Sequence, residues 1–319
     1  MLNINTLSPF LSVHRRQVRL LDNFFEISVV AKDEQWAEDK IAGAVTEINR
    51  VMALLSSTDE GSQISLINRN AGIQPVKVDQ ELFNLVNRSL KISELTQGAF
   101  DITYNSIDHS IWDKNINMKT LPDTETAKQA VRLINYRNVI LDIKKHTVFL
   151  KEKGMRIDLN SIAKGYATDR AKYVLQIQGV SSGIVNAFGD LITWGRQPDN
   201  NPWTIAAANP GQKLDVFSDL NISNMAISTS ADHKNYSVID GKKYVHMVNP
   251  KTGLPLRRIN SISVLSPSAE LAAAMAAPVM VLGVKLSLNL FNRLNQLVCV
   301  IVNDRKKVYT SKSINMMMC

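Results

Sequence analysis

Cysteine is almost absent from this sequence of 319 residues, which contains only Cys299 and Cys319. Cys299 lies inside the apolar run from Leu297 to Val302, where we expect an inert core residue, and Cys319 is the last residue. Two cysteines placed in this way provide neither a disulfide framework nor the clustered thiolates of a zinc site. Folds that depend on such cross-links are therefore excluded.

Long hydrophobic runs and targeting signals are also missing. The segment from Met1 to Arg16 has neither the apolar stretch nor the small-residue cleavage site of a signal peptide, and it has no cysteine for a lipobox. No apolar run reaches the roughly 18 residues that cross a membrane, so we expect no transmembrane segment. The sequence as given predicts a soluble protein. Its compartment stays open: cytoplasm, or periplasm if a leader has been removed.

The positive charge of the chain is not concentrated in any one block. The 37 Lys and Arg residues exceed the 29 Asp and Glu residues, which gives a net charge of +8, and aromatic residues make up only 6%. Nucleic-acid-binding proteins usually gather their charge on one face or element, so we expect no nucleic-acid partner. A solvated basic surface and the attraction of anionic ligands both remain open.

The residues that are present predict alternating helices and strands. Apolar residues at 45% and charged residues at 21% are typical of a globular protein that buries a core. Apolar spacings of three and four predict helices over residues 34–55, 79–95 and 124–134. Short β-like runs predict strands at residues 24–30, 139–142, 148–150, 183–185, 203–207, 262–265 and 297–302. No internal repeat or linker divides the chain.

A last helix is predicted from Pro267 to Leu282. Ser266 is the expected N-cap, and Pro267 is expected at the first helical position, where its missing N–H costs nothing. Pro278 cannot donate to the carbonyl of Ala274. We therefore expect a kink or a restart of the helix at Pro278.

Two segments combine glycine, a carboxylate and a helix end. Residues 98–103 fit either a turn that contacts a ligand or an ordinary helix end that leads into a strand. In residues 158–169 a strand-like run enters a polar turn that opens a helix, and the N–H groups of a helix start favour anions. Lys164 in this segment fits either a phosphate contact or a solvated helix residue.

His246 lies in an apolar alternation just before the turn at Asn249 and Pro250. The unperturbed pKa of histidine suits a general base, whereas a packed or hydrogen-bonded histidine fits the same pattern. The residue types alone leave both interpretations open.

Six short motifs follow one another along the chain. They are Ser-x-Ile-Ser-x-x-Asn at 62–68, Gly-Ala-Phe-Asp-x-Thr at 98–103, Asp-Leu-x-x-Ile-Ala-Lys-Gly-Tyr-Ala-x-Asp at 158–169, Val-Asn-x-x-Gly-Asp at 185–190, Ser-Thr-Ser at 228–230 and His-x-x-x-Pro-x-Thr-Gly at 246–253. In these motifs and their order the chain resembles the ApbE family of FAD:protein FMN transferases, over roughly residues 20 to 312. The resemblance implies a single interwoven α+β domain, related to the T-fold, with mixed sheets and flanking helices. This domain would span residues 19–319, after an N-terminal extension of residues 1–18.

The resemblance also implies a reaction, in which FMN passes from FAD to a Ser or Thr of an acceptor protein with a flavinylation motif, and AMP is released. FAD would lie in an elongated groove, with Mg²⁺ against its pyrophosphate. His246 matches the residue that helps to deprotonate the acceptor hydroxyl. The matching FAD contacts are Ala99, Phe100, Asp101, Asp158, Lys164 and Met247.

The metal site is where this sequence departs from the family. Members that it resembles hold the ion with an Asp and a Thr one helical turn apart, near a backbone carbonyl that corresponds to Ser161. The two side-chain positions are Ala273 and Ala277 here, and alanine offers no oxygen. We therefore expect weak magnesium binding and impaired transfer. Two alternatives stay open: a non-catalytic FAD-binding protein on the same scaffold, and alanines that only form a packing face.

Overall fold

An eight-stranded sheet forms the centre of the molecule. The computed structural model describes residues 10–20, 23–108, 120–204, 221–230, 236–257 and 259–312. Its main sheet has the strand order β1-β2-β6-β7-β8-β12-β13-β14, and all neighbouring strands are antiparallel. The strands are β1 Ser12–Leu20, β2 Asn23–Ala31, β6 Gly183–Asn186, β7 Asp190–Trp194, β8 Ala226–Ser230, β12 Ile259–Ser266, β13 Val298–Asn303 and β14 Val308–Thr310. Because this sheet joins strands from both halves of the chain, the predicted α+β domain is confirmed as a single unit.

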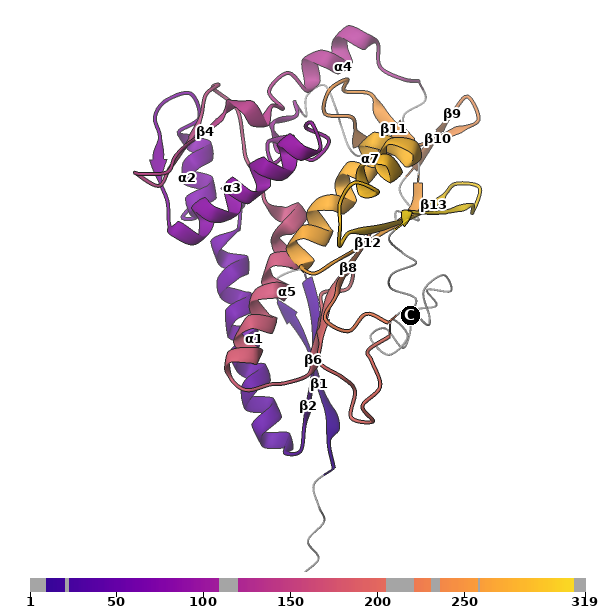
Figure 1. Ribbon diagram of the computed structural model, residues 1–319. Helices are drawn as coiled ribbons and strands as arrows, with labels where there is room; N and C mark the ends of the chain where they lie inside the picture. The colour runs from indigo at the N-terminus through magenta and orange to yellow at the C-terminus, as the bar shows by residue number, and fades with distance from the viewer. Residues whose placement is uncertain are drawn as a thin grey trace, which may run out of the picture.

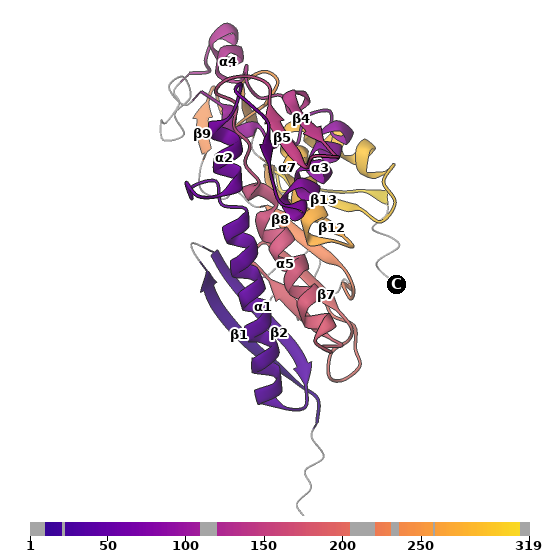
Figure 2. The same cartoon turned by 90° about the vertical axis from the view of Figure 1, so that its left-hand side faces the viewer.

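Three long helices pack on this sheet and on one another (Figures 1 and 2). They are α1 Glu34–Leu54, α5 Asn160–Ile177 and α7 Ala269–Phe291. In α1 the residues Ala37, Ile41, Ala44, Ile48 and Val51 are buried, as expected for an amphipathic helix with one face against the core. The predicted start of α1 is confirmed, with Asp33 as the N-cap.

Two smaller three-stranded sheets carry the other elements. One has the order β3-β5-β4 and the other β11-β10-β9. In Figure 1 their strands lie toward the upper left and the upper right, on either side of α7. The elements are β3 Val76–Lys77, β4 Val139–Asp142, β5 Thr147–Leu150, β9 Tyr236–Ile239, β10 Lys242–Val248, β11 Pro255–Arg257, α2 Gln63–Arg69, α3 Gln80–Leu95, α4 Thr124–Ala130 and the short 3-10 helices η1 Tyr104–Ser106 and η2 Tyr136–Asn138.

Helix α7 differs from the prediction at its start and at Pro278, whereas the predicted last residue, Leu282, directly precedes the break in the helix. The helix starts at Ala269, and its N-cap is Ser268, whose hydroxyl accepts a hydrogen bond from the N–H of Leu271 at 3.2 Å. Ser266 is still part of β12 and pairs with β8, so it is not free to cap. The backbone stays helical at Pro278 and leaves the helix at Gly283, where φ is +72°, because glycine adopts positive φ without a steric cost.

Two other predicted elements are shorter than expected. Helix α4 ends at Ala130 rather than at Ile134. Of the strand predicted over residues 203–207, only an isolated bridge from Thr204 to Asn221 is present in the described part, and residues 205–207 lie outside it.

Within the described residues, α7 is the one helix that is long and apolar enough to cross a membrane by length and composition. Its first half is buried against α5 and the main sheet. An apolar helix that packs in this way is the ordinary core helix of a mixed α and β domain.

Candidate functional site

Helices α5 and α7 run in opposite directions and meet at Gly165. A Cβ atom at Gly165 would lie 2.4 Å from the carbonyl oxygen of Ala269 and 3.1 Å from Cβ of Ala273, so only glycine allows this approach. One turn later on α5, Asp169 contacts the first residues of α7. One turn earlier on α5 is Ser161, which helical spacing places opposite Ala277.

The residues at this contact do not fit a protein-held magnesium ion. Mg²⁺ requires near-octahedral oxygen coordination, whereas Ala273 and Ala277 have no side-chain oxygen and Ser161 supplies one hydroxyl. Ala273 is 5% exposed and packs in the core. No group of three or more His, Cys, Asp or Glu side chains in the described ranges could hold a metal.

Asp169 of α5 links the two helices, because its side chain caps the N-terminus of α7. Its carboxylate accepts hydrogen bonds from the Ser268 hydroxyl at 2.8 Å and from the N–H groups of Ala269 and Glu270 at 2.8 and 2.9 Å. Burial raises the pKa of Asp169 in spite of these donors. The side chain therefore contributes as a buried acceptor that joins the two helices.

Lys164 lies on α5 close to a second buried carboxylate, Asp190 of β7. Asp190 is 6% exposed and accepts a hydrogen bond from the hydroxyl of Ser228 in β8 at 2.6 Å. Burial raises the pKa of Asp190, and the hydrogen bond from Ser228 and the positive charge of Lys164 oppose this shift. Three motif segments, at residues 158–169, 185–190 and 228–230, thus come together around Lys164 and Asp190.

The start of α5 is fixed by Asp158. This carboxylate accepts hydrogen bonds from Ser57 at 2.7 Å, from Asn105 at 2.8 Å, and from the backbone and side chain of Asn160 at 2.6 and 2.9 Å. The side chain of Asn68 bonds both backbone groups of Ile157. These contacts fix the turn, in which the N–H of Asn160 donates to Asp158 and the N–H groups of Ile162 and Ala163 donate to the carbonyl of Leu159. Asn160 and Ser161 are exposed at this start of α5.

The turn at residues 98–103 is packed against this helix start. The N–H of Asp158 donates to the carbonyl of Ile102 at 2.9 Å. Ala99 and Phe100 are buried, so a ligand at this turn would meet their backbone. Asp101 accepts from Thr103 and from the N–H of Tyr136, and burial raises its pKa.

Strand β10 carries His246 and Met247 to the same region. The hydroxyl of Tyr104 accepts a hydrogen bond from the N–H of Val248 at 2.9 Å, which joins β10 to the segment that follows the turn at 98–103. Between the pairs Tyr244–Arg257 and Val248–Pro255, β10 has three residues where β11 has one. His246 and the exposed Met247 lie in this bulge, and the side chain of His246 lies outside the described part. Bulges commonly occur next to active sites.

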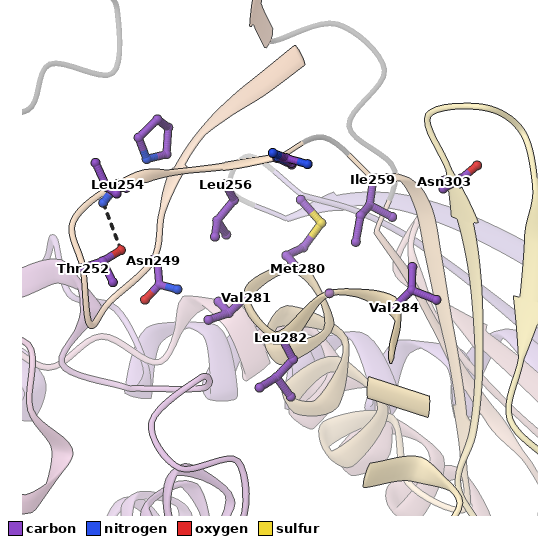
Figure 3. Close-up of a pocket in the computed structure, with 13 residues that line it drawn as sticks. Asn249, Thr252, Leu254, Leu256, Ile259, Met280, Val281, Leu282, Val284 and Asn303 are labelled. Carbon is purple, nitrogen blue, oxygen red and sulfur yellow. Dashed lines mark hydrogen bonds between the residues drawn. The ribbon is translucent and has the colours of Figure 1, made fainter. Parts of the chain in front are cut away.

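Three cavities border these segments. One of about 370 Å³ is lined by Gly98, Asp101 and Pro250, among others. A second, of about 670 Å³, lies beside Ser57 and Asn68. The third, of about 540 Å³, lies between the turn after β10 and the broken end of α7 (Figure 3).

Several residues that hold the site together were not identified from the sequence. Asp169 and Asp190 stand inside the quoted motifs, but residue type does not show that one caps another helix and the other lies beside Lys164. Ser57, Asn105 and Tyr104 lie outside the motifs. A polar residue next to a motif was the only signal for them.

Comparison with known proteins relates most of the chain to one family. A sequence model of the ApbE family matches residues 21–301. An FAD:protein FMN transferase of Klebsiella pneumoniae is 30% identical over 221 residues, which cover 69% of this chain and 68% of that protein. An FAD:protein FMN transferase of Buchnera aphidicola is 29% identical over 263 residues, which cover 81% of this chain and 77% of that protein.

Solved structures have the same fold. The crystal structure of the ApbE protein of Thermotoga maritima superposes with a TM-score of 0.79 at 27% identity and covers 97% of this chain and 100% of that one. The flavinyl transferase ApbE of Pseudomonas stutzeri superposes with a TM-score of 0.81 and covers 97% of this chain and 98% of that one. At 22% identity, this match shows a similar fold. The order of the six motifs, the match of the family model over residues 21–301 and the 30% identical relative together show that this chain belongs to the ApbE family.

Proposed function

We propose that this protein transfers FMN from FAD to a Ser or Thr hydroxyl of an acceptor protein and releases AMP. The observation that carries the proposal is the hydrogen-bonded assembly of the turn at 98–103, the start of α5 and β10. The proposal is supported by the link from the exposed start of α5, the helix that carries Lys164, through the turn at 98–103 to the strand that carries His246. Helix N-termini favour phosphate groups, and the curated relatives are named for this reaction.

In this proposal the FAD contacts are shared among three segments. The backbone of Ala99 and Phe100 and the carboxylates of Asp101 and Asp158 position the nucleotide, the ammonium group of Lys164 lies against the pyrophosphate, and Met247 contacts the flavin. Such fixed positive charge stabilises the charge that builds on a transferred phosphoryl group.

The proposed reaction is a displacement at the FMN phosphorus. The acceptor oxygen attacks this phosphorus, the pyrophosphate P–O bond breaks, and AMP leaves with the electron pair. His246 takes the proton of the hydroxyl, which is otherwise a poor nucleophile. Proton transfer to a positioned base contributes a factor of roughly 100 to 10,000 in rate.

Magnesium is expected to assist this reaction only weakly here. Ser161, Ala273 and Ala277 do not form a ligand set, so a bound ion would depend on FAD phosphates, water and backbone carbonyl groups. The two alanines also favour a second candidate function, in which the protein binds FAD without transferring FMN.

One experiment separates these two functions. The protein is incubated with FAD, Mg²⁺ and a purified acceptor domain, covalent FMN is measured by in-gel fluorescence, and FAD binding is measured by calorimetry. Transfer supports the first function, and binding without transfer supports the second. Undetectable FAD binding at ligand concentrations near 1 mM, with NAD bound more tightly, rules out both.

Replacing Lys164 by alanine is expected to raise the dissociation constant of FAD roughly 10- to 100-fold, because a charge-assisted hydrogen bond contributes about 1.5 to 3 kcal/mol. FAD binding should also depend less on salt. Lys172→Ala is the matched control, since Lys172 is a second half-buried lysine on α5. Equal affinities and salt slopes for Lys164→Ala and the parent would show that Lys164 is a solvated helix residue.

A further inference from the structure

The cavity of about 540 Å³ has the form of a groove between a strand and a helix. One wall is β11, which supplies Pro255, Leu256 and Arg257, and the other is the stretch of α7 from Met280 to Val284. Figure 3 shows Leu256 and Met280 pointing into the space between these walls. The space stays open at Gly283, where a Cβ atom would meet no atom within 4 Å.

The strand wall is an edge strand. β11 is the terminal strand of the sheet β11-β10-β9, and within the described part of the chain β10 is its one strand partner. An edge strand presents backbone N–H and C=O groups to any extended segment that lies beside it. Peptide-binding domains use this arrangement: a peptide adds to the edge strand and places alternate side chains in pockets.

The rim of the cavity has one lining cation, Arg257, and further cations adjoin its lining residues in the sequence. Lys285 follows Val284, and Lys251, in the turn between two lining residues, also lines the cavity of about 370 Å³. The lining residue Asn303 leads into an exposed turn with three cations and one carboxylate: Asp304, Arg305, Lys306 and Lys307. Among the described residues, none of the rim cations forms an ion pair. Lys307 lies over the ring of Tyr309 at 5.2 Å. Cations without an ion-pair partner beside a largely aliphatic cavity attract an acidic partner with an apolar side chain.

We propose that this groove binds an extended segment of the acceptor protein, with an apolar side chain between Leu256 and Met280 and acidic residues against the basic rim. The inference rests on the proposed function. The described lining residues are mostly aliphatic, and none of them is an aromatic residue on which a base could stack. A peptide therefore fits the groove better than a nucleic acid, although both are attracted by the positive charge.

The groove lies within reach of the proposed base. Asn249 lines the groove, and His246 precedes it by three residues on β10, about 10 Å at the rise of an extended strand. A segment bound along β11 is two strand spacings, again about 10 Å, from β10. A hydroxyl a few residues further along the bound segment then reaches the bulge that contains His246.

The test uses a fluorescein-labelled synthetic peptide with a central threonine, a leucine on each side and aspartates at both ends, and a second peptide with lysines in place of the aspartates. Fluorescence anisotropy should show that the parent protein binds the acidic peptide at least about tenfold more tightly. Arg257→Glu should lower the affinity for the acidic peptide and raise the affinity for the lysine peptide. Met280→Gln replaces methionine by a side chain of similar volume. It should lower the affinity for both peptides about fivefold, because it removes apolar contact.

The control is Lys32→Glu, which makes the same change in net charge at an exposed residue outside the groove. It should leave both affinities close to those of the parent. Absence of peptide binding near 1 mM, or equal effects of Lys32→Glu and Arg257→Glu, would overturn the inference. So would displacement of the peptide by an oligothymidylate at concentrations below the peptide's own dissociation constant. If FAD displaces the peptide and Arg257→Glu lowers the affinity for FAD, the groove binds the nucleotide. The proposed transfer would then stand, and this inference would be wrong.

Discussion

Replacing Ala273 by aspartate and Ala277 by threonine together is expected to raise magnesium-dependent FMN transfer roughly 100- to 1,000-fold, the share of a barrier that a metal ion can remove. The two positions are one turn apart on α7, so their oxygens converge opposite Ser161. Because Gly165 packs closely against Ala269 and Ala273, α5 and α7 must separate slightly to accommodate the added carboxylate. Initial rates with and without Mg²⁺, at saturating FAD, measure the effect.

Each single substitution should recover less than the pair, because Mg²⁺ tolerates incomplete coordination poorly and groups that act together are not additive. The matched control is Ala273→Asn with Ala277→Val, which copies the shapes without the carboxylate and hydroxyl. If the alanines only pack, the new carboxylate is buried without a partner. The Asp/Thr variant would then melt lower than the parent with and without Mg²⁺ and transfer no more FMN, and the metal interpretation would be wrong.

Asp169→Ala is expected to lower the free energy of unfolding by about 3 to 5 kcal/mol. The substitution leaves the buried N–H groups of Ala269 and Glu270 without their acceptor, and each buried unsatisfied group costs about 1 to 3 kcal/mol. It also removes the link between α5 and α7, so the start of α7 should exchange its amide hydrogens faster. Denaturant unfolding and hydrogen exchange measure the two effects.

Asp169→Asn keeps the shape of the side chain but only one of its two accepting oxygens. Because the N–H of Ala269 donates to one oxygen and the N–H of Glu270 to the other, the free energy of unfolding of this variant should fall between those of the parent and of Asp169→Ala. Asp123→Ala is a second control, since Asp123 caps α4 through two N–H groups but is exposed. If Asp169→Ala lowers the free energy of unfolding no more than Asp123→Ala does, the link between α5 and α7 contributes little to stability.

Much of the fold could be predicted because its periodic patterns are long. The spacing from Ala37 to Val51 and the alternation in β2 depend on local sequence alone, and both elements are confirmed. The start of α7 was predicted wrongly because two serines flank Pro267, and only the pairing of Ser266 with β8 decides between them. Local sequence does not contain that pairing.

The same distinction holds for the candidate site. The motifs placed the segments around Lys164 in the right order along the chain, but not their contacts in space. The bond from Val248 to the hydroxyl of Tyr104 joins residues 144 positions apart, and Asp169 caps a helix that begins 100 positions later. Such contacts arise from the sheet topology. The roles assigned to His246, Lys164 and the FAD contacts remain predictions.

The strand order of the main sheet also determines when the protein can fold during synthesis. β2 pairs with β6, and β8 pairs with β12, so the β1–β2 hairpin leaves the ribosome long before the strand that covers its inner edge. Sheets built from distant segments fold slowly because loop closure precedes pairing. Until β6 is made, the apolar strand β2 presents an open edge to neighbouring nascent chains, and we expect the yield of folded protein to depend on how quickly residues 32–182 are translated.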